Sequence, residues 1–305
     1  MPDFNLSHFF KHKFRDSFSN LKSSIIADRH IRKGDAPGIV NPPAGYESVF
    51  FDDFSGSSLD LEAWRLSQVW GDFHSGNLTQ YYDTSGEMSR TTPFGLELDL
   101  RNKPKKYIKS ELPEWRREDK LPEEFTIPVG VGLICTKESW QYGWFEAWIK
   151  LPKGQSYWPA FWLTGANSWP PEIDILEAYS QAGPNYEGPS FFGTLLKPFR
   201  RIQPNIHYGS SEENNKKMYG AWNIPVANCT ERFVQYACLW EEDKILIYYD
   251  GMLVFQCTDP KILKWFNKED AQQVIILNHG LHKDHPENPE ESSMIVKSIK
   301  VMQSK

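Results

Sequence analysis

The chain has 305 residues, enough for one large β domain or two small ones, and 40% of them are hydrophobic. Its formal net charge of −6 argues against a nucleic acid as partner, because proteins that bind nucleic acids present basic surfaces. No apolar run reaches the ~18 residues that a transmembrane helix requires.

The four cysteines, Cys135, Cys229, Cys238 and Cys257, give no indication of a metal site. None of them shows the Cys-x-x-Cys spacing that is typical of zinc ligands. Cys238 and Cys257 fall in segments expected to be strands and are interpreted as buried thiols, with a disulfide left open as the alternative. Cysteine usage therefore does not identify a compartment, and we expect no cofactor and no metal.

Residues 1–43 are predicted to form a short helix followed by a linker. Apolar residues recur at helical spacing with basic residues between them, and Gly34 marks the expected end of the helix. The segment lacks the unbroken apolar stretch of a signal peptide. We expect the helix to pack against the main domain, and the alternative is a weak contact with a membrane surface or a partner. The apolar positions are Phe10, Phe14, Phe18, Leu21 and Ile25.

Residues 44–305 are predicted to form one all-β domain. From Tyr46 onward, short alternating segments are separated by turn signals, the pattern of a β-sandwich. Residues 103–128 are rich in charge and proline and are expected to form a long surface loop. Because long loops in compact domains are often functional, we expect this loop to lie at the rim of a cleft.

Two segments, residues 141–150 and 157–163, alternate between aliphatic or phenylalanine side chains and indoles. The face that carries the indoles holds too many aromatic side chains to be an ordinary solvated surface. Because an indole matches the apolar face of a pyranose ring, we expect this face to be the floor of a sugar-binding cleft. The alternative is a second aromatic core beneath a loop. The residues on this face are Trp144, Glu146 and Trp148 in the first segment and Trp158 and Trp162 in the second.

The stretch from Trp169 to Glu177 holds three carboxylates among branched apolar residues. Its composition predicts a strand, on which Glu172 and Asp174 share one face. Strict alternation would bury Glu177 and expose its apolar neighbour. We therefore predict a β-bulge at Ile175–Leu176, which returns Glu177 to the acidic face.

With this bulge, Glu172 and Glu177 lie roughly 13 Å apart between Cα atoms at the usual strand rise. If each side chain leans inward by about 4 Å, the carboxylates end roughly 5 Å apart, the spacing of a retaining glycosidase pair. Asp174 would lie beside Glu172 and hold a hydrogen bond or a proton, which separates the pKa values of the group. The alternative is an acidic strand face that is merely solvated.

At this stretch the sequence resembles glycoside hydrolase family 16, whose bulged members, the laminarinase-, agarase- and carrageenase-like enzymes, carry Glu-x-Asp-x-x-Glu. The resemblance implies that Glu172 is the nucleophile, Asp174 its helper and Glu177 the acid/base. It covers roughly residues 46–305 and implies a concanavalin A-like β-jelly-roll sandwich with a concave substrate cleft.

Further positions are assigned by the same resemblance. Asn205 and His207 lie in a segment similar to the family's His-x-Gly strand, and His207 is expected on the leaving-group side. Asn77 resembles a cleft asparagine. Two positions depart from the family: Trp148 stands where many β-glucan-cleaving members have Arg, and Lys297 stands where calcium-binding members tend to have Asp. No structural calcium is therefore expected at Lys297.

The favoured function is endo-hydrolysis of a β-linked polysaccharide, of the β-glucan or galactan class, by two-carboxylate double displacement with retention. A transglycosylase with the same residues and a non-catalytic, lectin-like carbohydrate-binding domain are the alternatives. Polysaccharide is the expected partner. The resemblance implies an extracellular or cell-envelope location, although the chain shows no signal peptide.

Overall fold

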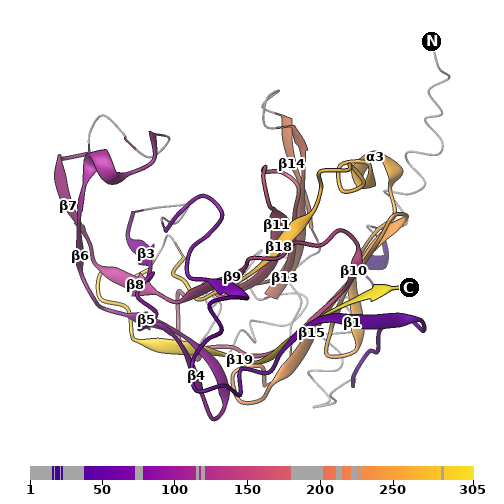
Figure 1. The fold of residues 1–305 in the computed structure, drawn as a ribbon, viewed down its shortest axis with the longest axis horizontal. Helices are drawn as coiled ribbons and strands as arrows, with labels where there is room; N and C mark the ends of the chain where they lie inside the picture. Colours follow the sequence, from indigo (N-terminus) through magenta and orange to yellow (C-terminus); the bar gives the residue numbers. More distant parts are fainter. Residues whose placement is uncertain are drawn as a thin grey trace.

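The computed structural model describes two β-sheets packed face to face with very little helix, which confirms the predicted all-β sandwich (Figure 1). No helix in the described part is long and apolar enough to cross a membrane. The residues described are 16, 18–20, 22, 38–72, 78–114, 117, 121–179, 202–210, 215–220, 226, 228–282 and 285–305.

The larger sheet, sheet A, contains ten of the described strands. Its neighbours are antiparallel except for the pair β3 and β8. Strand β1 pairs with β19 and strand β4 pairs with β5, beside the main path of the sheet. In spatial order, that path is β17 (Met252–Cys257), β16 (Lys244–Tyr249), β15 (Val234–Glu241), β10 (Gly143–Lys150), β19 (Ser292–Ser304), β5 (Gly95–Arg101), β8 (Val129–Val131) and β3 (Gln80–Tyr82), with β1 at Tyr46–Asp52 and β4 at Ser89–Thr92.

The smaller sheet, sheet B, contains seven described strands, and all its neighbouring pairs are antiparallel. Outside the N-terminal segment, the described residues include two single-turn helices, α3 (Pro260–Leu263) and a 3₁₀ turn at Lys109–Glu111. In spatial order, sheet B is β14 (Asn215–Gly220), β13 (Ile202–Ser210), β12 (Glu172–Ala178), β11 (Ala160–Gly165), β18 (Gln273–Asn278), β9 (Leu133–Thr136) and β2 (Trp64–Arg65).

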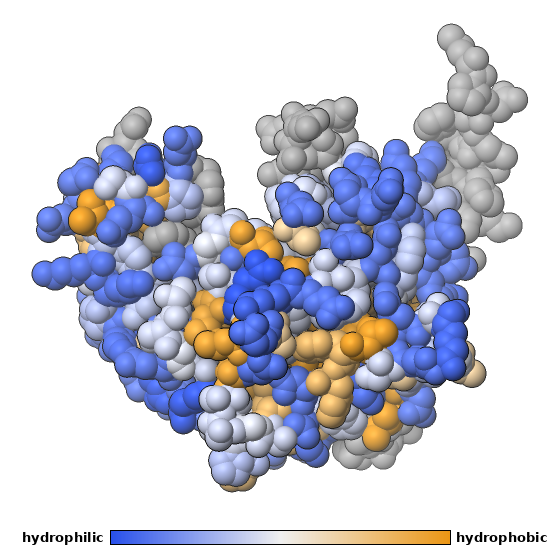
Figure 2. Space-filling model, viewed as in Figure 1, coloured by the Kyte–Doolittle hydropathy of each residue, from blue (hydrophilic) through white to orange (hydrophobic). Residues whose placement is uncertain are grey.

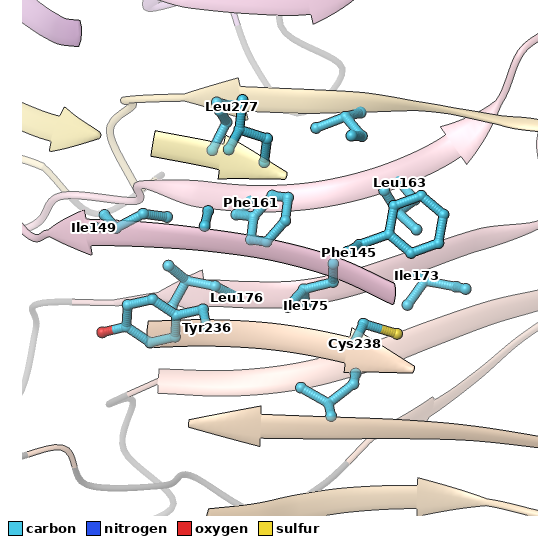
Figure 3. Close-up of a cluster of buried hydrophobic side chains, with 14 of the residues drawn as sticks. Phe145, Ile149, Phe161, Leu163, Ile173, Ile175, Leu176, Tyr236, Cys238 and Leu277 are labelled. Atoms are coloured by element: carbon cyan, nitrogen blue, oxygen red, sulfur yellow. The ribbon is translucent and has the colours of Figure 1, made fainter. Parts of the chain in front are cut away.

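The main core lies between the two sheets, where alternate residues of each strand point inward (Figure 3). Burial of each Ile, Leu or Phe side chain contributes roughly 1.5–3 kcal/mol to folding. The Tyr249 hydroxyl of sheet A donates a hydrogen bond of 2.8 Å to the Ile175 carbonyl of sheet B, which ties the sheets together. Labelled members of this core are Phe145, Ile149, Phe161, Leu163, Ile173, Ile175, Leu176, Tyr236, Cys238 and Leu277.

Strand β12 contains the predicted bulge. Adjacent residues of β11 pair with Leu176 and with Asp174, so Ile175 is the extra residue, and the register against β13 shifts in the same interval. Ile175 and Leu176 are both buried in the core. Glu177 therefore returns to the face that Asp174 occupies, and the bulge predicted from the burial conflict is confirmed.

The expectation that the indole-bearing face of residues 141–150 forms the floor of the sugar-binding cleft is wrong. Strand β10 lies in sheet A between β15 and β19, and its alternate apolar side chains enter the core between the sheets. Trp144, Glu146 and Trp148 consequently face away from sheet B. The period-2 pattern correctly identified which side chains share a face, but it carries no information on which sheet a strand joins.

Glu146 is the centre of a hydrogen-bonded cluster on this far face of sheet A. Its carboxylate accepts hydrogen bonds from Trp144 Nε1 (3.0 Å), Trp148 Nε1 (3.2 Å) and Gln235 Nε2 (2.9 Å). Gln235 also bonds to both backbone groups of Val40, at 2.9 and 2.8 Å. The two indoles thus form an aromatic cluster beneath the segment that leads into β1, which agrees with the alternative interpretation of these residues.

Residues 103–128 are not a structureless loop, because they contain the two-stranded hairpin of β6 (Lys105–Ile108) and β7 (Glu124–Ile127). A small apolar cluster that includes Tyr81, Tyr107 and Ile127 anchors the hairpin to the sandwich. Figure 1 shows β6 and β7 projecting from one end of the molecule, with β14 on the other side of the gap above sheet B.

The described residues of the predicted N-terminal helix, 16, 18–20 and 22, are helical, and the segment packs against the main domain. The buried Asp16 carboxylate accepts hydrogen bonds from Thr258 N (2.8 Å) and Gln256 Nε2 (2.7 Å), and Asn20 Oδ1 accepts one from Gln256 N (2.9 Å). Because β17 is an edge strand of sheet A, these side chains satisfy backbone donors that have no neighbouring strand.

Candidate active site

The three acids of β12 lie together on the face of sheet B that points away from the core. Asp174 is 3% exposed and Glu177 9% exposed, so both carboxyls are largely removed from water. Figure 2 shows the molecular surface hollowed between the lobe that carries β6 and β7 and the rest of the sandwich. The acids are thus grouped in the arrangement that the sequence predicted, without any contribution from β10.

Glu172 is held between two neighbours on the same side of the site. Trp169 Nε1 donates a hydrogen bond of 2.9 Å to Glu172 Oε2. His207, directly opposite Glu172 in the register of β13, places Nε2 3.3 Å from Glu172 Oε1 and 3.3 Å from Asp174 Oδ2. His207 therefore faces Glu172 and Asp174, beside the expected nucleophile and not on the leaving-group side where the resemblance had placed it.

Glu177 is held by three neutral donors. Asn205 Nδ2 donates to Glu177 Oε2 at 2.6 Å, while Trp158 Nε1 and the Tyr179 hydroxyl donate to Glu177 Oε1 at 3.1 and 2.9 Å. The rings of Trp158 and Tyr179 lie 5.3 Å apart, and His282 lies against both. Asn205, which is buried, thus orients the carboxylate rather than presenting its amide to the cleft.

Burial and neighbouring charges raise the pKa values of two of the acids, Glu172 and Asp174. Burial, with the charge of Asp174, raises the pKa of Glu172 well above its usual value, and the neighbouring His207 opposes this rise. Burial, with the charge of Glu177, likewise raises the pKa of Asp174. Adjacent buried carboxyls resist ionising together, so Glu172 and Asp174 share one proton. With that proton on Asp174, Glu172 is an ionised carboxylate that faces the Trp169 donor.

Replacing Asp174 by Asn is expected to raise the melting temperature at neutral pH relative to the wild type. A raised pKa in the folded state means that the stability from the protonated carboxyl is complete below the unfolded value of about 3.9 and is lost as pH rises through the folded value. The gain should therefore shrink toward zero near pH 4. Melting curves from pH 4 to 8 test this, with Asp270→Asn as an exposed control, and a gain that is independent of pH would contradict it.

The other residues that the sequence assigned to the cleft lie in different places. Trp162 pairs with Asp174 and shares its face, as expected, but the indole is nearly buried, donating to Asn278 Oδ1 at 2.8 Å with the Trp70 ring 6.0 Å away. It therefore belongs to a packed apolar cluster on the cleft side of sheet B and offers little open ring surface for a sugar. Asn77 lies outside the described residues, and Glu146 and Trp148 lie on the far face of sheet A.

Three aromatic neighbours of the acids were not predicted: Trp169, Tyr179 and His282. Tyr179 follows Glu177 by two residues, so strand parity could have placed it on the same face. Trp169 precedes two prolines, where no alternation applies. His282 comes from the chain after β18, and nothing in its local sequence indicates that it meets Tyr179.

One group of side chains in the described part of the chain could hold a metal ion: Glu172, Asp174 and His207, whose ligand atoms lie within 4.8 Å of one another. Lys297, the position at which calcium was not expected, is exposed on β19 with Nζ 5.9 Å from the centre of the Phe233 ring.

Comparison with known proteins agrees with this geometry. The sequence profile "Glycosyl hydrolases family 16" matches residues 118–277, which include β10 to β18 and all three acids. An endo-1,3-1,4-beta-glycanase of Rhizobium meliloti, EglC, is 30% identical over 132 residues, covering 42% of this chain and 24% of its own. Glucan endo-1,3-beta-glucosidase A1 of Niallia circulans is 24% identical over 243 residues, covering 73% of this chain and 31% of its own.

The fold is also that of a solved structure. SCLam, a non-specific endo-beta-1,3(4)-glucanase, superposes with a TM-score of 0.63 at 23% identity, covering 88% of this chain and 96% of that one. A variant of SCLam has been solved with 1,3-beta-D-cellobiosyl-glucose at its active site. This chain spans less than a third of the two curated relatives named above, but the profile covers more than half of this chain. The chain therefore belongs to family 16 of the glycosyl hydrolases.

Proposed function

We propose that this chain is a retaining endo-glycosidase that hydrolyses a β-linked glucan. The observation that carries the proposal is the contrast between two glutamates on one strand face. Glu172 lies beside the proton-sharing Asp174, and Glu177 is oriented by three neutral donors. Retaining glycosidases need such a pair, with one carboxylate to attack carbon and one carboxyl to exchange a proton with the leaving group.

In the first step, Glu172 attacks the anomeric carbon while Glu177 transfers its proton to the departing glycosidic oxygen. The products are a glycosyl ester on Glu172 and a shortened chain with a free hydroxyl. In the second step, Glu177 removes a proton from water, and the resulting nucleophile breaks the ester and restores Glu172. Asp174 retains its proton throughout, which limits the charge that accumulates beside Glu172.

A glucan is favoured over a galactan because EglC, A1 and SCLam are all described as enzymes of β-1,3- or β-1,3-1,4-linked chains. The presence of Trp148 in place of the arginine of many β-glucan-cleaving members does not argue against a glucan, since this side chain lies on the far face of sheet A. Trp158 is the predicted indole that lies at the site, beside Glu177.

The test is a panel of laminarin, mixed-linkage β-glucan, agarose and carrageenan, scored by release of reducing ends. Proton NMR of the first products gives the stereochemistry, and retention requires the β anomer to appear before mutarotation. Transfer to added oligosaccharide in place of hydrolysis would identify a transglycosylase. Binding without turnover of any of these substrates would identify a lectin-like domain and overturn the proposal.

The position of Trp148 leads to a separate prediction. Trp148→Ala is expected to lower stability by about 1–3 kcal/mol and to leave KM unchanged, because its hydrogen bond to Glu146 and its packing lie on the far face of sheet A. Trp158→Ala, a matched loss of an indole beside Glu177, is expected to change the kinetics. Melting temperature and KM of both variants decide this, and a raised KM with unchanged melting in Trp148→Ala would show the assignment to be wrong.

A further inference from the structure

On the nucleophile side of the cleft, one imidazole and two carboxylates converge from two neighbouring strands. His207 Nε2 on β13 lies 3.3 Å from Glu172 Oε1 and 3.3 Å from Asp174 Oδ2 on β12. All three atoms lie within 4.8 Å of one another. The arrangement differs from a plain acidic cluster because a ring nitrogen is equidistant from the two oxygens.

These distances match the edges of a metal tetrahedron. Zinc binds histidine nitrogen at about 2.0–2.1 Å and carboxylate oxygen at about 2.0–2.2 Å. In a regular tetrahedron the edge is about 1.6 times the bond length, which gives about 3.3–3.5 Å between a nitrogen and an oxygen ligand. Both contacts of His207 therefore already have the required length, and only the separation of the two carboxylate oxygens has to adjust.

A second observation also indicates a ligand. Asp174 Oδ2 is buried, with its side chain only 5% exposed, and it meets no geometric hydrogen-bond criterion within the described residues; its ionic contact there is with His207 Nε2 at 3.3 Å. Buried polar atoms are normally paired, and an unpaired one is costly. The atom lies beside the His207 ring nitrogen, where a shared cation would be its partner.

The surroundings orient the ligand atoms and leave the imidazole side of the group open. Glu172 Oε2 accepts the hydrogen bond from Trp169 Nε1, so Oε1 is the oxygen that faces His207. The Trp169 ring lies 5.9 Å from the His207 ring and limits its rotation. The His207 side chain is 24% exposed, against 12% for Glu172, so a hydrated ion can approach past the imidazole. The fourth position of the tetrahedron would then be taken by water from the cleft.

We propose that the cleft of this protein binds one divalent cation of the zinc class through Glu172, Asp174 and His207. An imidazole ligand suits Zn²⁺, Cu²⁺ and Ni²⁺, whereas Ca²⁺ and Mg²⁺ prefer six or more oxygen ligands that this group does not supply. Bound there, the cation holds the Glu172 carboxylate and excludes the sugar from it. The binding site is independent of the proposed function, and only the resulting inhibition depends on it.

Titration of the full chain with ZnCl₂ by isothermal calorimetry, without substrate, tests the site. The wild type is expected to show one site that His207→Gln weakens by about tenfold or more, because even the outer partners of a metal site contribute that much. His285→Gln, a histidine outside the site, should leave this binding unchanged. CaCl₂ should give no binding at the site.

Equal zinc affinity in the wild type and His207→Gln would overturn the proposal, as would strong binding of Ca²⁺ that depends on Asp174. If His207→Gln does not fold, Asp174→Asn serves as the second variant, with the same weakening expected. Laminari-oligosaccharide should reduce the zinc affinity of the wild type by competition. A zinc site that depends on His207 in a protein that cleaves no glucan would support this proposal while refuting the proposed function.

Discussion

Glu172→Gln is expected to lower kcat/KM on the preferred glucan by at least about 10⁴-fold, because the amide cannot form the glycosyl ester and no neighbouring group can replace it. Asp174 cannot substitute as nucleophile, since its burial raises its pKa and keeps it protonated. The amide is close in size to the carboxyl, so packing against Trp169 and His207 is retained.

The measurement compares initial rates of reducing-end release with substrate affinity from calorimetry. Affinity for oligosaccharide should change little, because the loss concerns a step after binding. Glu138→Gln, the same exchange at an exposed glutamate, is the control and should retain full activity. Activity of Glu172→Gln near that of the wild type would refute double displacement at this residue.

The face that each residue of β12 occupies could be predicted because burial imposes a strict condition on a strand. Glu177 and Leu176 would both have been misplaced under plain alternation, and only an extra residue corrects both errors. The prediction depended only on the conflict between strand alternation and the burial expected for neighbouring residues, and that conflict can be read from the local sequence. Asn205 and His207 were assigned to the cleft by the family resemblance alone, and the structure pairs them with Asp174 and Glu172 on the next strand.

Sheet membership could not be predicted in this way. β10 and β11 show the same alternation, yet one lies in sheet A and the other beside β12 in sheet B. The choice depends on which strands pair across the core, a long-range property that periodicity does not encode. The far-face indole Trp148 and the cleft indole Trp158 were consequently indistinguishable in the sequence. For the same reason, His282, which reaches the site from a distant loop, gave no signal.

The second large effect is expected in Glu177→Ala. Loss of the proton donor should slow cleavage of polysaccharide by about 10²–10⁴-fold, because its sugar leaving group departs poorly without a proton. An aryl β-glycoside with an acidic phenol needs little protonation, so its first step should be affected much less. The glycosyl ester on Glu172 would then accumulate, since no base activates water.

Sodium azide should restore turnover of the aryl glycoside by Glu177→Ala and yield a β-glycosyl azide. Azide is a strong nucleophile that needs no general base, and the side chain removed leaves room beside the donors Asn205, Trp158 and Tyr179. In the wild type the anionic Glu177 would repel azide, so no acceleration is expected there. An α-glycosyl azide would indicate a single displacement and an inverting pair. No rescue, in a variant that folds and still binds substrate, would remove Glu177 from the acid/base role and make Tyr179 the next candidate, because its hydroxyl lies 2.9 Å from Glu177 Oε1.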